Sequence, residues 1–217
     1  MNSGPEMVTD TMTSLPFTRR RLLGTSLALV AALSLPRLAW AQSTTDQAFA
    51  FIQKTGGELS GAVNAQASNK DKALALQTII DRSVDVTAVG RFCLGRFWRL
   101  ATPAQQKDYI DLFHRVLVSN ITGKVGDYQG VVFTMVHAAQ REDGVAVTTT
   151  VTRPDSAPNR VDWLVSSESG SPKIIDVIAE GTSLRLTQRN DYAAYLSRNN
   201  NSIQALIDAL KRQAAAS

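Results

Sequence analysis

The spacing of the apolar residues changes at Gly126, and this change constrains the fold more than any other feature of the sequence. Before Gly126, apolar residues recur every third or fourth position, which is typical of amphipathic helices. After it, four runs rich in β-branched residues are separated by short turn-forming segments, a pattern that predicts an antiparallel meander. Helical spacing returns after Gly181. A sheet of this kind has an apolar face to cover, and the flanking helices are the available cover. We therefore expect an α+β fold.

The expected elements follow from these runs. Helices are expected at Asp46–Ala67, Asn69–Arg82, Asp85–Gly95, Thr102–Val125, Leu186–Arg198 and Ser202–Arg212. Strands are expected at Val131–Ala139, Val145–Arg153, Arg160–Ser167 and Lys173–Glu180. Along the second strand Val145, Val147, Thr149 and Val151 share one side, and along the third Val161, Trp163 and Val165 do. The alternation leaves open which side faces the helices.

Two helix starts and one helix end can be read from residues 85 to 105. Asp85 can cap a short helix, because its carboxylate can accept the unpaired backbone N–H groups of the first turn. Gly95 can end that helix at a backbone conformation that glycine tolerates best. Thr102, Pro103 and Gln105 form a capping box with proline at the first helical position.

The aromatic residues concentrate in the same region, and they have two interpretations. The cluster consists of Phe92, Leu94, Phe97, Trp98 and Phe113. Aromatic residues at helical spacing are most often ordinary core. They can also form the stiff apolar wall of a ligand cavity. Spacing alone does not separate the two.

The sequence carries no recognisable catalytic or metal-binding cluster. His114 and His137 are the two histidines, and neither has a second ligand at metal-binding spacing. Cys93 is the single cysteine, so an internal disulfide is excluded, and its apolar neighbours predict a buried, inert thiol. No glycine-rich phosphate loop, nucleophile elbow or HExxH motif occurs. We expect no metal, no cofactor and no enzymatic activity.

Asp176 is the one acidic residue that leaves a catalytic alternative open. It lies in an apolar strand, where burial could raise its pKa and make it a base. In the other interpretation the carboxylate caps a loop or pairs with an arginine such as Arg99 or Arg185.

The first 41 residues have the pattern of a cleaved export signal. A basic stretch, Arg19-Arg20-Arg21, abuts an apolar run that ends at Leu35, and Ala39-Trp40-Ala41 is a small-x-small cleavage site. The adjacent arginines followed by two leucines resemble a twin-arginine signal, and a Sec signal is the alternative. We expect cleavage after Ala41 and a mature domain of residues 42–217 in the periplasm.

The charge balance excludes some classes of partner. The precursor has 23 basic and 19 acidic residues, and its first 41 residues hold four arginines and two acids, which leaves the mature chain at +2. A nucleic-acid-binding domain has a strongly basic face, so this balance argues against nucleic acid. It also gives no reason to expect strong attraction to an anionic membrane.

Two separated motifs resemble the MlaC family, also called the toluene-tolerance (Ttg2) proteins. The first is LGRFWRLATPAQQKDYIDLFHRVL, and the second is IIDVIAEGTSLRLTQRNDYAAYL. The matching positions are Leu94, Gly95, Trp98, Arg99, Ala101, Thr102, Gln105, Gln106, Phe113, Asp176, Val177, Glu180, Gly181, Ser183, Leu184, Arg189 and Tyr192. The resemblance covers about residues 46 to 213, nearly all of the mature chain.

The resemblance implies a fold and a function. The fold is a helical subdomain packed on an NTF2-like curved antiparallel sheet of about four strands, with an apolar cavity between them. Helices would occupy about residues 46–125 and 186–213, and strands about 130–181. The function is a periplasmic carrier that shuttles phospholipid between an outer-membrane lipoprotein complex and an inner-membrane ABC transporter with an MCE-domain ring.

Pattern and implied fold together give candidate residues for the lipid pocket. These are Phe92, Leu94, Trp98, Phe113, Leu117, Val131, Phe133, Val147, Val151, Trp163 and Val177. The family also includes hopanoid-associated members, so a hopanoid is an alternative cargo. An NTF2-like enzyme that uses Asp176 and a periplasmic adaptor without ligand are the alternatives from other functional classes.

Overall fold

The computed structural model describes residues 35–216, with side chains from residue 44 onward. The basic stretch and most of the apolar run of the expected export signal lie outside these residues. The chain divides into two units, Met1–Leu38 and Ala39–Ser217. Within residues 35–216, no helix combines the length and the apolar character that a membrane span requires.

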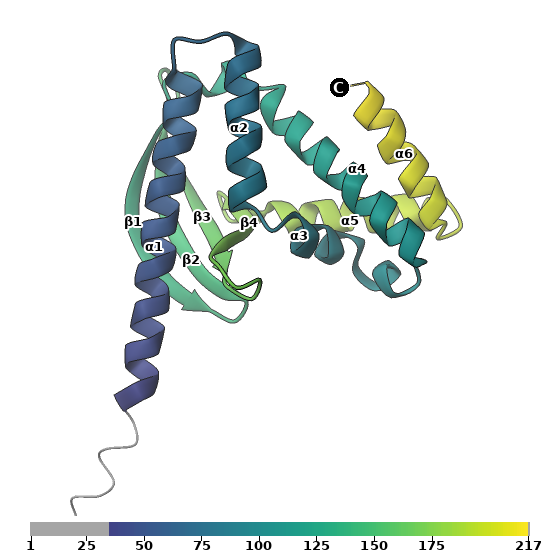
Figure 1. The fold of residues 1–217 in the computed structure, drawn as a ribbon, viewed down its shortest axis with the longest axis horizontal. Helices are drawn as coiled ribbons and strands as arrows, with labels where there is room; N and C mark the ends of the chain where they lie inside the picture. The colour runs from purple at the N-terminus through teal and green to yellow at the C-terminus, as the bar shows by residue number, and fades with distance from the viewer. Residues whose placement is uncertain (1–34, 217) are drawn as a thin grey trace, which may run out of the picture. The chain divides into compact units, whose positions relative to one another are not determined.

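The described residues form helices before and after one antiparallel sheet along the chain, as Figure 1 shows. The α-helices are α1 (Leu35–Asn64), α2 (Asn69–Ser83), α3 (Val86–Leu94), α4 (Pro103–Thr122), α5 (Leu184–Arg198) and α6 (Ile203–Ala215), with 3₁₀ turns η1 (Gly95–Arg99) and η2 (Val125–Tyr128). The strands are β1 (Val132–Arg141), β2 (Gly144–Thr152), β3 (Asn159–Ser166), β4 (Lys173–Ala179) and β5 (Thr182–Ser183), in the order β1-β2-β3-β4-β5. The expected α+β meander is confirmed.

The sheet has one strand more than expected. The expectation was about four strands, but β5 pairs with the end of β4 through Ile178 opposite Ser183 and Ala179 opposite Thr182. The turn between β4 and β5 needs two residues with positive φ, Glu180 at 51° and Gly181 at 82°. A two-residue strand is too short for alternation to reveal it.

The predicted helix-end chemistry is present. The Asp85 carboxylate accepts a hydrogen bond from the Ala88 N–H at 2.8 Å, and Gly95 ends α3 with φ of 58°. Thr102 Oγ1 accepts from the Gln105 N–H at 3.2 Å, and Gln105 Oε1 accepts from the Thr102 N–H at 3.1 Å. The capping box therefore closes in both directions.

The helix-facing side of the sheet carries one of the hydrophobic cores. Val145, Val147 and Val165 are buried against Ala48 and Ile52 of α1. This settles which side of the second and third strands faces the helices. Helix α1 approaches the sheet closely at Gly56, where an added Cβ would lie 3.3 Å from Phe133 Cβ. Gly56 of α1 is therefore a contact point with β1.

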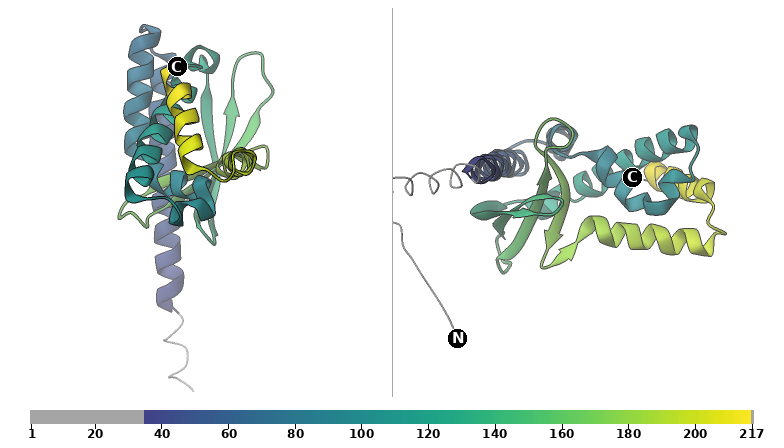
Figure 2. Two further views of the ribbon diagram at one scale, coloured as in Figure 1. Left: turned by 90° about the vertical axis from the view of Figure 1, so that its right-hand side faces the viewer. Right: turned by 90° about the horizontal axis from the view of Figure 1, so that it is seen from below.

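A second core lies within the helices α3 to α6, which gather to one side of the sheet in Figures 1 and 2. It is centred on Tyr109, Leu196 and Ile207, each with no exposed surface. The hydroxyl of Tyr109 donates to the Gly90 carbonyl at 2.9 Å, so the one polar atom of that ring is satisfied. Helix α5 starts directly after β5, which joins this helical subdomain to the sheet.

Candidate functional site

Two largely apolar cavities lie where the helices meet the sheet. The first, here called the sheet cavity, has a volume of about 480 Å³. Its walls come from α1, α2 and the helix-facing side of the sheet. Its lining includes Leu59, Leu76, Ile80, Tyr128, Arg153, Asn159, Trp163 and Glu180. The second, the helix cavity, has a volume of about 380 Å³ and is walled by α3, α4, α5 and β4.

The two cavities adjoin. Val84, Ile121, Ile174 and Val177 belong to the walls of both. These four residues come from the link between α2 and α3, from α4 and from β4, and they form a partition between the two cavities.

Backbone hydrogen bonds hold this partition in place. Val84 forms a parallel bridge with Ile174, and the Asp85 N–H donates to the Ile174 carbonyl at 3.0 Å. The Val84 N–H also donates to the Ile80 carbonyl, which ends α2. The end of α2 is therefore fixed to β4, and the apolar face of α2 is directed over the sheet cavity.

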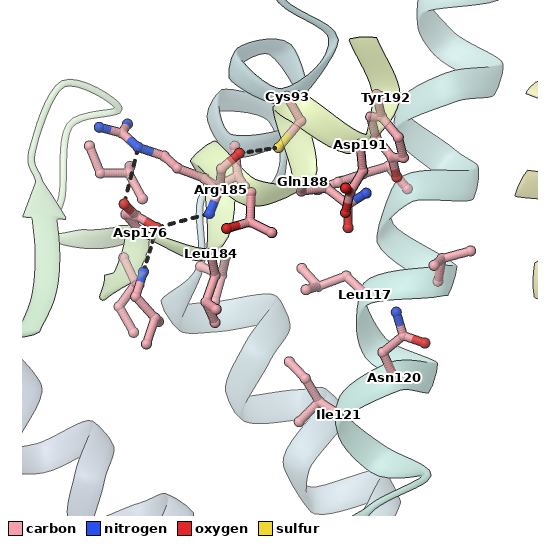
Figure 3. Close-up of a pocket in the computed structure, with 18 residues that line it drawn as sticks. Cys93, Leu117, Asn120, Ile121, Asp176, Leu184, Arg185, Gln188, Asp191 and Tyr192 are labelled. Carbon is pink, nitrogen blue, oxygen red and sulfur yellow. Dashed lines mark hydrogen bonds and ion pairs between the residues drawn. The ribbon is translucent and has the colours of Figure 1, made fainter. Parts of the chain in front are cut away.

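Polar residues lie at the solvent-facing part of the helix cavity. Figure 3 shows Asn120 on α4 and Gln188 and Asp191 on α5 lining this part. The apolar side chains of Leu117 and Ile121 line the same cavity from α4. The cavity thus has an apolar interior and a polar edge, which is the usual arrangement for a ligand with an apolar part and a polar part.

Asp176 also lines the helix cavity, but its oxygens are committed to neighbours. Its carboxylate accepts hydrogen bonds from the Val177 N–H at 2.8 Å, the Ser183 hydroxyl at 2.6 Å and the Arg185 N–H at 3.1 Å. The Arg185 Nε lies 3.4 Å away in an ion pair (Figure 3). The arginine partner is therefore Arg185 and not Arg99. A carboxylate held by four donors anchors the start of α5 and is poorly placed to act as a base.

Cys93 is buried, as its neighbours predicted. It is 1% exposed, and burial raises the pKa of its thiol to about 12. The thiol donates to the Arg185 carbonyl at 3.5 Å. A thiol with this pKa is not a nucleophile at neutral pH.

The candidate pocket residues fall into two groups. Seven of them border the cavities. Phe113 and Leu117 line the helix cavity, and Val177 lines both cavities. The sheet cavity is lined by Val131, Phe133, Val151 and Trp163. Four lie elsewhere: Phe92, Leu94, Trp98 and Val147. Leu94 is in the core of the helical subdomain, and Val147 is fully buried beside α1.

The two remaining aromatic residues lie beside arginines. The Arg185 guanidinium lies 4.2 Å and that of Arg189 5.0 Å from the centre of the Phe92 ring. The Arg91 guanidinium lies 5.3 Å from the Trp98 ring. These distances are those of cation–π contacts, so the two rings pack against arginine side chains and not against a cavity.

Sequence reasoning missed the contribution of α2 and of the partition. Leu76, Ile80, Ile121 and Ile174 line cavities, but the candidate pocket residues do not include them. The available signal was weak, because an apolar residue beside a cavity has the same spacing as one in a filled core.

Metal binding finds no support in the side chains that the structure describes. No group of three or more His, Cys, Asp or Glu residues among them could hold an ion. His114 instead forms a 2.6 Å contact between its Nε2 and Asp81 Oδ1, which links α4 to α2.

Comparisons with known proteins agree with the architecture. A family model described as "MlaC protein" matches residues 42–212. The toluene tolerance protein ttg2D of Pseudomonas putida is 28% identical over 190 residues, which cover 84% of this chain and 86% of that protein. A structure of a phospholipid-binding protein from Ralstonia solanacearum, in complex with a phospholipid, matches with a TM-score of 0.68 at 20% identity. That match covers 78% of this chain and 98% of the other. At this identity it shows a shared fold.

Proposed function

The chain belongs to the MlaC protein family, and from this premise we propose that it carries phospholipid through the periplasm between the outer and inner membranes. It would act as the shuttle of an Mla-type ABC transport system. Its partners would be an outer-membrane lipoprotein complex and an inner-membrane transporter complex with MCE domains. As a family member the chain is a non-enzymatic lipid-binding carrier.

The observation that carries this proposal is the pair of adjoining apolar cavities. Exposing an acyl chain to water costs about 0.8 kcal/mol per CH₂ group, so a shuttle has to enclose the tails. Cavities of about 380 and 480 Å³ that share four wall residues offer space for two tails of one lipid. A polar head group needs no such enclosure and can remain in contact with water.

The comparisons support the choice of a phospholipid. The Ralstonia solanacearum protein of the same fold is described as phospholipid-binding and was solved with a phospholipid bound. The family match starts at residue 42, directly after the cleavage site expected at Ala41. This start supports a mature domain of residues 42–217 that is exported to the periplasm.

The experiment is native mass spectrometry of the protein purified from the periplasm of an expressing bacterium, followed by solvent extraction of the bound material. We expect one diacyl phospholipid per chain. A folded protein that is free of lipid, and that also refuses added phospholipid, would overturn the proposal. In that case a ligand-free adaptor role would explain the fold better.

A further inference from the structure

Arg153 and Glu180 are the charged residues in the wall of the sheet cavity. Both lie at the same end of the sheet. Arg153 follows the last residue of β2, and Glu180 follows the last residue of β4. The strand between them, β3, starts at this end with Asn159, which also lines the cavity. Tyr128 of η2 adds a phenol hydroxyl to the same wall.

These charges are not used to stabilise each other. Among the ion pairs of the described residues, neither Arg153 nor Glu180 takes part. Strands β2 and β4 are separated by β3, which puts their backbones roughly 10 Å apart. Arg153 uses one of its five N–H donors, since its Nη1 donates to the Asp127 carbonyl at 3.3 Å. The other donors remain available to a ligand.

The polar edge of the helix cavity lacks an available cation. Its arginine, Arg185, is paired with Asp143 at 2.7 Å and with Asp176 at 3.4 Å. The other charged residue of that edge is Asp191, whose carboxylate would repel a phosphate. An anionic group therefore finds a favourable partner at the Arg153 end of the sheet cavity and not at the edge of the helix cavity.

We propose that the Arg153 end of the sheet cavity binds the phosphodiester head group of the lipid, with the phosphate on Arg153 and Asn159 and a head-group ammonium on Glu180. This deepens the proposed function and rests on it. Arginine suits a phosphate because its planar fork can donate two parallel hydrogen bonds. A separated cation and anion at one cavity end match a zwitterionic head group, such as phosphoethanolamine, better than a purely anionic one. The tails would then run from this end past Trp163 to the partition.

The test compares lipids with identical tails. Delipidated protein is offered equimolar mixtures of phosphatidylethanolamine, phosphatidylglycerol and diacylglycerol, and the bound species are counted by native mass spectrometry. We expect phosphatidylethanolamine to be taken up in preference to diacylglycerol by about tenfold, equivalent to about 1.4 kcal/mol. Phosphatidylglycerol should fall between the two, because it keeps the phosphate and lacks the ammonium.

Variants of Arg153 and Glu180 test the contribution of each charge on its own. Arg153→Ala should reduce the preference for phosphate-bearing lipids to within about twofold, whereas Arg153→Lys should keep part of it. Glu180→Gln should abolish the preference for phosphatidylethanolamine over phosphatidylglycerol and leave the preference over diacylglycerol. The matched controls are Arg212→Ala on α6 and Glu168→Gln in the loop between β3 and β4, which change charge away from the cavity. Both controls should select lipids as the wild type does.

The outcomes distinguish this inference from the carrier function. If Arg153→Ala and Arg153→Lys bind all three lipids with wild-type selectivity, the head-group site is wrong and the carrier function stands. If the wild type takes up no diacyl lipid, the carrier function itself fails. Glycerophosphoethanolamine, which has the head group without tails, tests whether the site binds a soluble phosphodiester instead of a lipid head group. We expect it not to compete, and competition at lipid concentrations would overturn the assignment to a lipid head group.

Discussion

Arg185 shows at the scale of one residue how the sheet and the helical subdomain are joined. Its guanidinium pairs with Asp143 in the β1–β2 turn and with Asp176 in β4, and it lies over Phe92 of α3. Its side chain is only 13% exposed, so these pairs are more shielded from water than ordinary surface ion pairs. One side chain from α5 thus connects two parts of the sheet to α3.

Cys93 gives a prediction about chemical reactivity. Because burial raises the pKa of its thiol to about 12, the thiolate at pH 8 should be roughly a thousandfold rarer than in an unperturbed cysteine. We expect iodoacetamide to leave the native protein unlabelled and to label it fully in denaturant, as read by intact-mass spectrometry. Equal labelling rates in the two conditions would show that Cys93 is accessible and contradict its burial.

Asp162 gives a prediction about pH. Burial opposes ionisation, but hydrogen bonds from Thr148 and Arg160 to the carboxylate prevail and lower its pKa. A pKa that is lower in the folded than in the unfolded state adds stability at neutral pH. That stability is lost as the pH falls below the unfolded value of about 3.9 and through the folded one. Asp162→Asn should therefore cost more stability at pH 7 than at pH 3 in urea titrations. A larger loss of stability at pH 3 than at pH 7 would contradict a lowered pKa for Asp162.

At the scale of the elements, local end signals control where the helices start. The capping box of Thr102 and Gln105 starts α4, whose side chains Phe113 and Leu117 border the helix cavity. We expect Thr102→Ala to lower the free energy of unfolding by about 0.5–2 kcal/mol, since a lost N-cap typically costs that much. Chemical denaturation measures this change in the free energy of unfolding. Thr102→Ser keeps the hydroxyl and should recover most of the loss; if it is as unstable as the alanine variant, the cap is not the cause.

The elements could be predicted from the sequence because their signals are local. Thr102, Asp85 and Gly95 act through neighbours within a few residues, and the β-branched alternation from Val145 to Val151 needs only one strand. The cavity walls could not be predicted in this way. Whether Ile174 borders a void or a filled core depends on where Val84 attaches to β4, a contact between residues 90 positions apart in the sequence. The same applies to Phe92, whose neighbours are arginines of α5.

At the scale of the whole molecule, the partition between the two cavities should decide how much lipid is enclosed. Val177 borders both cavities, so Val177→Trp would fill the junction. If the tails lose burial of two or more CH₂ groups at about 0.8 kcal/mol each, phospholipid affinity should fall by more than about tenfold. The measurement is lipid occupancy by native mass spectrometry at matched lipid concentrations.

The control for this variant is Val136→Trp. Val136 is a 54% exposed residue of the edge strand β1, so the same substitution there leaves both cavities unchanged. It should retain wild-type lipid occupancy. Equal occupancy in the two variants would mean that the partition has no part in binding.

If the acyl tails occupy the two adjoining cavities, covalent mapping should locate the tail ends on the cavity walls. A phospholipid with a photoactivatable diazirine near the end of each tail is bound, irradiated and located by peptide mass spectrometry. We expect crosslinks on both sides of the partition, at Leu76 in the sheet cavity and Leu117 in the helix cavity, and on the partition residues Val84, Ile121, Ile174 and Val177. Crosslinks confined to exposed surface, such as Leu100 or Val132, would place the tails outside the cavities and overturn the proposal.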